Sequence, residues 1–194
     1  MKTSYMARPS VKVAFAVLLA IALAMVFSPM NAYAASLTKA TLKSVYDSDS
    51  VATQQKKATT IKKTGRYAIV SKNGAGIIKF KAPKTKTYKF TFSKLKSSKA
   101  TDVACVVGFC KIYSGGDYTY LNVKTKEGKR PRAPFVSASL ADGKTVTLDG
   151  YDYKRLATRT AKLAIKKGQT VYIALGAKNM SNSYVRSSYR VAIS

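Results

Sequence analysis

The sequence predicts an all-β protein, an antiparallel β-sandwich of the jelly-roll kind, preceded by a helical leader. Beyond residue 65, apolar side chains recur at every second position, the period of a strand with one buried face. Gly, Asn, Asp and Pro turn signals separate about eight or nine such runs at regular spacing, which is typical of sandwiches. Helical periodicity is not convincingly signalled after the leader.

Residues 1–34 have the parts of a secretory signal peptide. The run from Val13 to Phe27 has no charged residue, and small residues precede the expected cleavage site after Ala34. The positive charge before this run comes from three residues, Lys2, Arg8 and Lys12. An uncleaved anchor is the alternative. No Cys lies near the cleavage site and no twin-Arg pair is present, so we expect export by the general route. The mature protein should be extracellular, either free or held at the cell wall.

The rest of the chain divides into a short segment and one sandwich domain. Residues 35–64 are rich in Ser, Thr, Ala and Lys and predict a flexible segment or edge strands, with a helical turn as a further alternative. The sandwich domain covers residues 65–194. Its strands are expected, in chain order, at residues 66–70, 78–82, 88–92, 102–113, 118–125, 145–148, 156–165, 170–175 and 185–193. The main connections are expected at 73–74, 83–87, 114–117, 127–134, 142–143, 149–150 and 166–168.

Two of these strands suggest a site for an anion. Pairing 78–82 with 88–92 as a hairpin sets Phe80 across from Phe90 and Lys81 across from Lys89. Like charges directly opposed destabilise a sheet, so this face is either well solvated or holds an anion. The candidate polyanion-binding residues are Lys79, Lys81 and Lys89.

The charge of the chain supports an anionic partner. The chain has 35 Lys+Arg, 8 Asp+Glu and no His; losing the leader removes three bases and leaves 32 against 8, a net charge of +24. Self-repulsion of this size costs stability and needs a reason. Nearly all of the bases are Lys, which favours diffuse attraction over geometry-specific recognition. We expect a phosphate-bearing wall polymer or an acidic glycan as partner; nothing selects nucleic acid.

Catalysis and metal binding are weakly supported. The absence of His excludes a Ser-His-Asp triad, and no Gly-rich phosphate loop is present. Two thiols without His do not make a zinc site. Asp149 and Asp152 could act as an acid–base pair on a glycan, but an Asp-Gly turn has the same composition. We therefore expect no enzyme activity and no cofactor, with wall-polymer hydrolysis as a remote alternative. Tyr151 and Tyr153 are candidates for stacking on a ligand.

Cys105 and Cys110 are the only cysteines, in the run CVVGFC. In one continuous strand they would face opposite sides and lie too far apart to bond. A tight turn at Val107-Gly108 would bring them together, and export favours the bridge. A disulfide, two free buried thiols and intermolecular pairing all stay open.

Two stretches resemble a known family. They are GIIKFKAPKTKTYKFTF from Gly76 to Phe92 and AKLAIKKGQTVYIAL from Ala161 to Leu175, with the closing strand YRVAI. They are similar to the bacterial pre-peptidase C-terminal type of β-sandwich over roughly residues 76–194. The sequence departs at Lys86, where the family usually has Gly. The resemblance implies a jelly-roll-like fold without catalytic residues of its own, in a secreted or surface protein; some relatives bind collagen or polysaccharides.

The leading hypothesis is a secreted, non-enzymatic module that binds an anionic extracellular polymer through lysine-rich sheet faces. The alternative is an accessory structural subunit that pairs with another surface protein through a sheet edge or an apolar patch.

Overall fold

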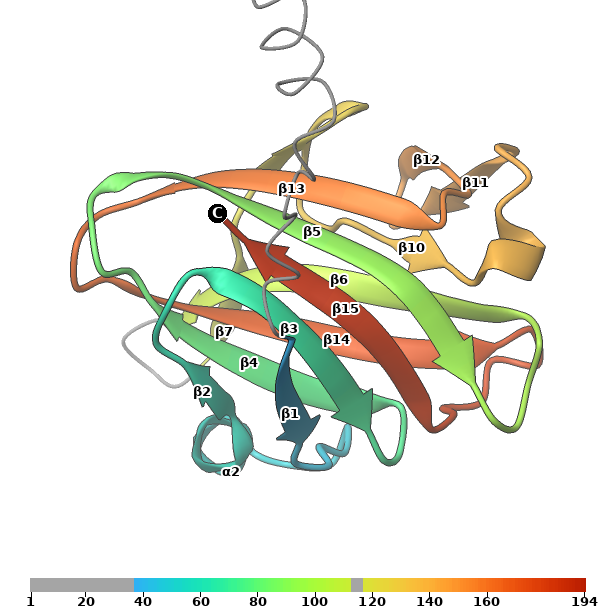
Figure 1. Cartoon of the computed structure of the whole chain (residues 1–194), viewed down its shortest axis with the longest axis horizontal. Helices are drawn as coiled ribbons and strands as arrows, with labels where there is room; N and C mark the ends of the chain where they lie inside the picture. The colour runs from blue at the N-terminus through green and yellow to red at the C-terminus, as the bar shows by residue number, and fades with distance from the viewer. Residues whose placement is uncertain (1–36, 113–116) are drawn as a thin grey trace, which may run out of the picture. The chain divides into compact units, whose positions relative to one another are not determined.

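The computed structural model describes residues 37–112 and 117–194, which fold as a β-sandwich (Figure 1). The expected signal peptide and most of the expected turn at 114–117 lie outside the described residues. The all-β fold class is confirmed. No helix among the described residues is long and apolar enough to cross a membrane.

The front layer in Figure 1 is a seven-stranded sheet, which we call sheet A. Its strand order is β1-β3-β15-β5-β13-β8-β9. Neighbouring strands run antiparallel, except that β1 pairs with β3 in parallel at one edge. In chain order its strands are β1 (Thr38–Leu42), β3 (Gly65–Ser71), β5 (Lys86–Ser97), β8 (Val123–Thr125), β9 (Gly128–Arg130), β13 (Thr158–Ile165) and β15 (Ser187–Ile193).

The second layer, sheet B, has the order β10-β6-β14-β4-β2, with β7 also paired to β6. The edge pair β2 and β4 is parallel. Its strands are β2 (Thr59–Ile61), β4 (Ala75–Lys81), β6 (Val103–Ile112), β7 (Tyr118–Tyr120), β10 (Phe135–Val136) and β14 (Thr170–Asn179). A separate hairpin joins β11 (Thr145–Leu148) to β12 (Tyr151–Lys154), and the helical elements are α2 (Val51–Lys57) and the 3-10 turn η1 (Ala138–Leu140).

An aromatic cluster fills the space between the two sheets. The ring of Phe80 from sheet B meets Tyr88 at 5.1 Å and Phe90 at 5.5 Å, both edge to face, and Phe90 meets Phe109 at 5.1 Å. Edge-to-face pairs add to the stabilisation from burial because the ring edge is positive and the ring face negative. The alternation of apolar residues therefore predicted the core side of these strands correctly.

The predicted hairpin between 78–82 and 88–92 is wrong. β4 lies in sheet B and β5 in sheet A, so Phe80 faces Phe90 across the core and not across a strand pair. Lys81 is paired in register with Thr170, and Lys89 with Lys162. The connection 82–85 crosses from one sheet to the other, and residues 86–87 of the expected turn already belong to β5.

Residues 38–61 belong to the same compact unit as the rest of the sandwich. Of the alternatives for this segment, the structure has edge strands: β1 extends sheet A and β2 extends sheet B. Leu42 and Ile61 are buried in the core and hold these strands in place. The helix α2 was not predicted; Ser50 caps it by accepting a hydrogen bond from the Thr53 backbone N–H.

Two stretches between residues 118 and 134 also differ from expectation. The single strand expected at 118–125 is two strands, because β7 pairs in sheet B and β8 in sheet A. The expected loop at 127–134 contains β9, which forms the edge of sheet A beside β8. These short strands carry part of the site described next.

Candidate polyanion-binding face

Four lysines stand side by side on the outer face of sheet A. The register pairs Lys89 of β5 with Lys162 of β13, Lys162 with Lys124 of β8, and Lys124 with Lys129 of β9. Directly opposed residues of neighbouring strands point to the same face, with Cα atoms about 4.5–5.5 Å apart. All four residues are exposed. We call this set the lysine row.

The surrounding face is basic as well. The alternation and register of sheet A place further cations on the same side, namely Lys39, Arg66, Lys96 and Arg190. No Asp or Glu occurs in any strand of sheet A or sheet B within the described residues. Asp152 lies in β12 of the separate hairpin, and the other seven acids lie in connections. The strands of this face therefore contribute no side-chain carboxylate to neutralise the row.

Several acids are instead paired with cations elsewhere. These ion pairs are Asp49–Lys57, Asp142–Arg155, Asp149–Arg132 and Glu127–Arg159. None of them involves a member of the lysine row. The acids of these four pairs thus compensate cations away from the lysine row.

A buried arginine fixes the strands that carry half of the row. Arg159 lies on the core side of β13 and is 1% exposed. Its Nε donates to the Pro134 carbonyl at 2.8 Å, one terminal nitrogen donates to the Lys154 carbonyl at 2.6 Å, and the other meets Glu127 in the β8–β9 turn. Because Glu127 lies between Lys124 and Lys129 in sequence, this pair holds the hairpin that presents them.

The environment of Glu127 keeps its carboxyl ionised. Partial burial raises the pKa of Glu127, but the hydrogen bond and the positive charge of Arg159 outweigh burial, so the pKa lies below its usual value. Sequence reasoning missed this pair, although a lone Glu in a chain with 35 basic residues was a signal worth following.

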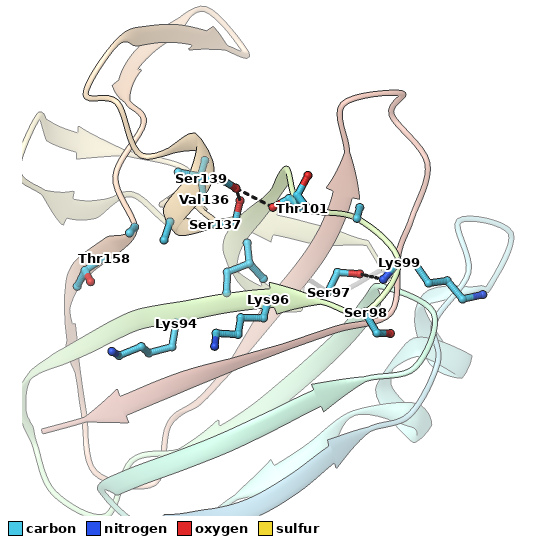
Figure 2. A pocket seen from close by; sticks show the side chains of 14 residues that line it. Lys94, Lys96, Ser97, Ser98, Lys99, Thr101, Val136, Ser137, Ser139 and Thr158 are labelled. Atoms are coloured by element: carbon cyan, nitrogen blue, oxygen red, sulfur yellow. Dashed lines mark hydrogen bonds between the residues drawn. The ribbon is translucent and has the colours of Figure 1, made fainter.

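A hollow beside β5 is lined by lysine and hydroxyl side chains but does not form an anion pocket (Figure 2). Ser139 Oγ donates to the Thr101 carbonyl at 2.7 Å and contacts Ser137 Oγ at 2.9 Å, so these hydroxyls are already engaged. In Figure 2, Lys94 and Lys96 extend from β5 on the side away from these serines. The two lysines therefore belong to the outer face of sheet A.

A bulge explains why Lys94 and Lys96 point outward, although Phe90 and Phe92, at the preceding even-numbered positions of β5, point into the core. Lys94 adopts a left-handed backbone conformation with φ of 58°, and the pairing of β5 with β15 shifts register there. The extra residue of a bulge interrupts the two-residue alternation. The bulge thus places both lysines on a face that already has an excess of positive charge.

The predicted polyanion-binding lysines are divided between the two sheets. Lys89 is a member of the row. Lys79 and Lys81 lie on β4 in sheet B, where the Lys79 ammonium is 5.8 Å from the centre of the Tyr172 ring and Lys81 is exposed near the strand end. The structure therefore does not bring the three together, because β4 and β5 are in different sheets.

The two predicted stacking residues differ in exposure. Tyr151 is 38% exposed, with the Arg130 guanidinium 5.2 Å from its ring centre. Tyr153 is 1% exposed and cannot stack on a ligand; that prediction is wrong, because its ring packs inward near Arg159. The neighbouring carboxylates have structural contacts: Asp149 pairs with Arg132 and Asp152 accepts from the Thr147 hydroxyl at 2.8 Å.

Both cysteines are free and buried, and the disulfide candidate is wrong. β6 runs unbroken through both, so five positions of extended chain separate them and their side chains face opposite sides. Cys105 lies in the core, and Cys110 packs beside Tyr172 on the outside of sheet B. Burial raises the pKa of Cys110 to about 12 and raises the pKa of Cys105 as well.

Within residues 37–112 and 117–194, no three His, Cys, Asp or Glu side chains are placed to hold a metal ion.

Comparisons with known proteins place few limits on function. No family model and no curated protein matches the chain. A similar solved structure is CorA, described as a surface-associated copper-binding protein important in copper acquisition by Methylomicrobium album BG8. The sequence identity is 6%, the match covers 71% of this chain and 98% of that chain, and the TM-score is 0.42.

Proposed function

We propose that this protein is a secreted, non-enzymatic binding module that associates with an anionic extracellular polymer through the outer face of sheet A. The lysine row carries the proposal. Four exposed ammonium groups from neighbouring strands, with no carboxylate among the strand residues around them, repel one another in the free protein. A polyanion laid across the strands removes this repulsion at every position.

The chemistry of lysine suits a polymer with repeated charges. A lysine ammonium is a point charge on a flexible stem and adjusts to different spacings, whereas arginine favours one planar geometry. Binding through several such contacts releases counterions, so the affinity falls steeply as salt rises. Phosphate-bearing wall polymers and acidic glycans both have repeated charges of the required sign. The resemblance to the pre-peptidase C-terminal type stays a prediction that agrees with a module of this kind.

The test compares two variants that lose the same charge. In the row variant, Gln replaces Lys89, Lys124, Lys129 and Lys162; in the control variant, Gln replaces four exposed turn lysines, Lys62, Lys63, Lys166 and Lys167. Binding to inorganic polyphosphate and to isolated Gram-positive cell walls is measured from 50 to 500 mM salt. We expect the row variant alone to lose most of the affinity at low salt. In the row variant, the slope of log affinity against log salt should become less negative by about three.

Two results would overturn the proposal. Equal losses in both variants would show that only net charge matters. Salt-insensitive binding of the unmodified protein would show that another surface carries the interaction. Export is tested separately, by mass spectrometry of the secreted product, whose first residue should be Ala35.

A further inference from the structure

A groove of about 610 Å³ crosses the outer face of sheet B, and its floor is made of small residues. The floor includes Val106 and Gly108 of β6 and Ala174 and Gly176 of β14, which lie opposite one another in register. Neither glycine has a positive φ, so backbone conformation does not require it. Glycine is required at position 108 because the Tyr120 ring lies directly over it: a Cβ there would lie 2.4 Å from Tyr120 Cε1.

Exposed tyrosines form the walls. Tyr46, Tyr120 and Tyr184 are 56%, 42% and 41% exposed and come from three separate segments, the β1–α2 connection, β7 and the β14–β15 connection. The Tyr184 ring lies against Gly176 as Tyr120 lies against Gly108, with Cε1 3.2 Å from the position of a Cβ. Exposed aromatic residues gathered in one hollow indicate an interaction site.

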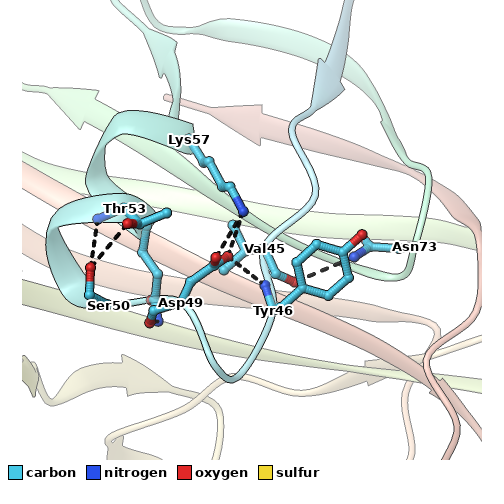
Figure 3. Close-up of polar contacts among 8 residues, drawn as sticks. Val45, Tyr46, Asp49, Ser50, Thr53, Lys57 and Asn73 are labelled. Carbon is cyan, nitrogen blue, oxygen red and sulfur yellow. Dashed lines mark hydrogen bonds and ion pairs between the residues drawn. The ribbon is translucent and has the colours of Figure 1, made fainter.

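The wall that carries Tyr46 is held in place by polar contacts (Figure 3). Asp49 accepts from the Tyr46 backbone N–H at 2.8 Å and pairs with Lys57 Nζ at 2.7 Å. Asn73 Nδ2 donates to the Val45 carbonyl at 3.4 Å. The loop is therefore ordered before any ligand arrives, which lowers the entropy cost of binding.

The groove is electrically balanced, unlike the rest of the protein. Arg132 Nε pairs with Asp149 at 2.5 Å, and the other lining cation, Lys178, shares the groove with the carboxylate of Asp47. Asp47 also accepts from the Tyr184 hydroxyl at 3.4 Å. Each of the two cations that line the groove is therefore matched by an acid, Asp47 in the lining and Asp149 beside it. This local balance favours a neutral ligand over an anion.

Amide groups around the rim offer both donors and acceptors. Gln54 donates through Nε2 to a backbone carbonyl, Asn179 accepts through Oδ1 from a backbone N–H, and Asn182 accepts through Oδ1 from Lys178. Their other amide atoms have no protein partner among the described residues. A ligand with many hydroxyl groups can satisfy both kinds.

We propose that this groove binds a neutral saccharide chain. Arg132 lies 4.6 Å from the centre of the Tyr120 ring, and Lys178 lies 4.6 Å from the centre of the Tyr184 ring. The apolar faces of the sugar rings pack on the ring faces that these cations leave free, and the sugar hydroxyls bond to the rim amides and Asp47. This site is on the opposite sheet from the lysine row and goes beyond the proposed polyanion binding, on which it does not depend.

The test measures binding of neutral hexasaccharides in 500 mM salt, where attraction to polyanions is screened. The probes are hexamers of β-1,4-linked glucose and of β-1,4-linked N-acetylglucosamine, added to the secreted protein. Tyrosine fluorescence is a direct readout because the chain has no Trp. Tyr120→Ala and Tyr184→Ala should each weaken binding of the preferred hexamer at least tenfold, while Tyr120→Phe keeps it, since Phe retains the ring.

Tyr151→Ala is the matched control, an exposed tyrosine outside the groove lining that should have no effect. Failure of both hexamers to bind at 10 mM overturns the inference. An equal loss of hexamer affinity in Tyr151→Ala also overturns it. Concentration-dependent dimerisation that Tyr184→Ala abolishes overturns it as well, because the groove would then be occupied by a second copy of the protein. Unchanged polyphosphate binding by the tyrosine variants separates this test from that of the lysine row.

Discussion

Replacing Lys162, one of the two inner lysines of the row, should make the protein more stable. Lys162 is opposed by Lys89 on one side and by Lys124 on the other, so Lys162→Gln removes two like-charge pairs. Two unit charges 5 Å apart repel by about 0.8 kcal/mol in bulk water. Flexible side chains can move the ammonium groups apart, so we expect a gain in the free energy of unfolding of about 0.5–1.5 kcal/mol at low salt.

Urea denaturation at 20 mM and at 1 M salt measures this gain. The Debye length at 1 M salt is about 3 Å, which is shorter than the separation of the lysines. The difference in the free energy of unfolding between the variant and the unmodified protein should therefore nearly vanish at 1 M salt. Lys39→Gln is the matched control, because Lys39 lies on the same face opposite Ala68 and has no opposed charge. Lys162→Gln should also weaken polyphosphate binding. Together, the two results would show that Lys162 lowers the stability of the fold and raises its affinity for the polyanion.

The reasoning is refuted if Lys162→Gln and Lys39→Gln change stability equally at low salt. A gain for Lys162→Gln that persists at 1 M salt would equally contradict it, since the cause would then not be repulsion between the lysines.

Three further predictions concern the interior. Arg159→Ala should lower the free energy of unfolding by about 3–5 kcal/mol, because it leaves Glu127 uncompensated; Arg155→Ala, at a more exposed pair, should cost less than about 1 kcal/mol in the same urea titration. Since the pKa of Glu127 is below its usual value of 4.5, its stabilisation is present above that pH and is lost as the pH falls through the folded pKa. Acid titrations followed by circular dichroism should therefore show less loss for Glu127→Gln than for the unmodified protein. Because burial raises the pKa of both thiols, iodoacetamide at pH 8 should leave Cys105 and Cys110 unmodified in the folded protein and alkylate both in urea without reductant; unreacted thiols in urea would indicate a disulfide.

The two-residue alternation predicted which side of each strand is buried, but not the sheet to which the strand belongs. Phe80 and Phe90 are both in the core as expected. A short turn-forming loop such as 83–87 can close a hairpin or cross between layers, and local sequence does not distinguish the two. The Asp149-Gly150 turn was predicted correctly because Asp-Gly is a preferred sequence for a tight hairpin. Both residues have the positive φ that such a turn requires.

The lysine row required information that no local pattern contains. Its members come from β5, β8, β9 and β13, and β13 follows the other three in sequence but lies between β5 and β8 in the sheet. Each lysine by itself is an ordinary solvent-facing residue of an amphipathic strand. The seven-residue helix α2 was missed for a related reason, since it is too short to show a helical period.

The absence of acids from the strands of sheets A and B, together with the absence of His, gives pH a diagnostic use. Carboxylates titrate near pH 4, and Lys and Arg titrate well above pH 9. The described strands of the two sheets contain neither His nor a carboxylate, so they contribute no side chain that ordinarily titrates between about pH 5.5 and 7.5. Across this window, a change in the affinity of the sandwich for a polymer reports ionisation of the polymer. A titration of binding could thus tell a phosphate monoester, which gains a charge near pH 6, from a phosphodiester, sulfate or carboxylate, which does not.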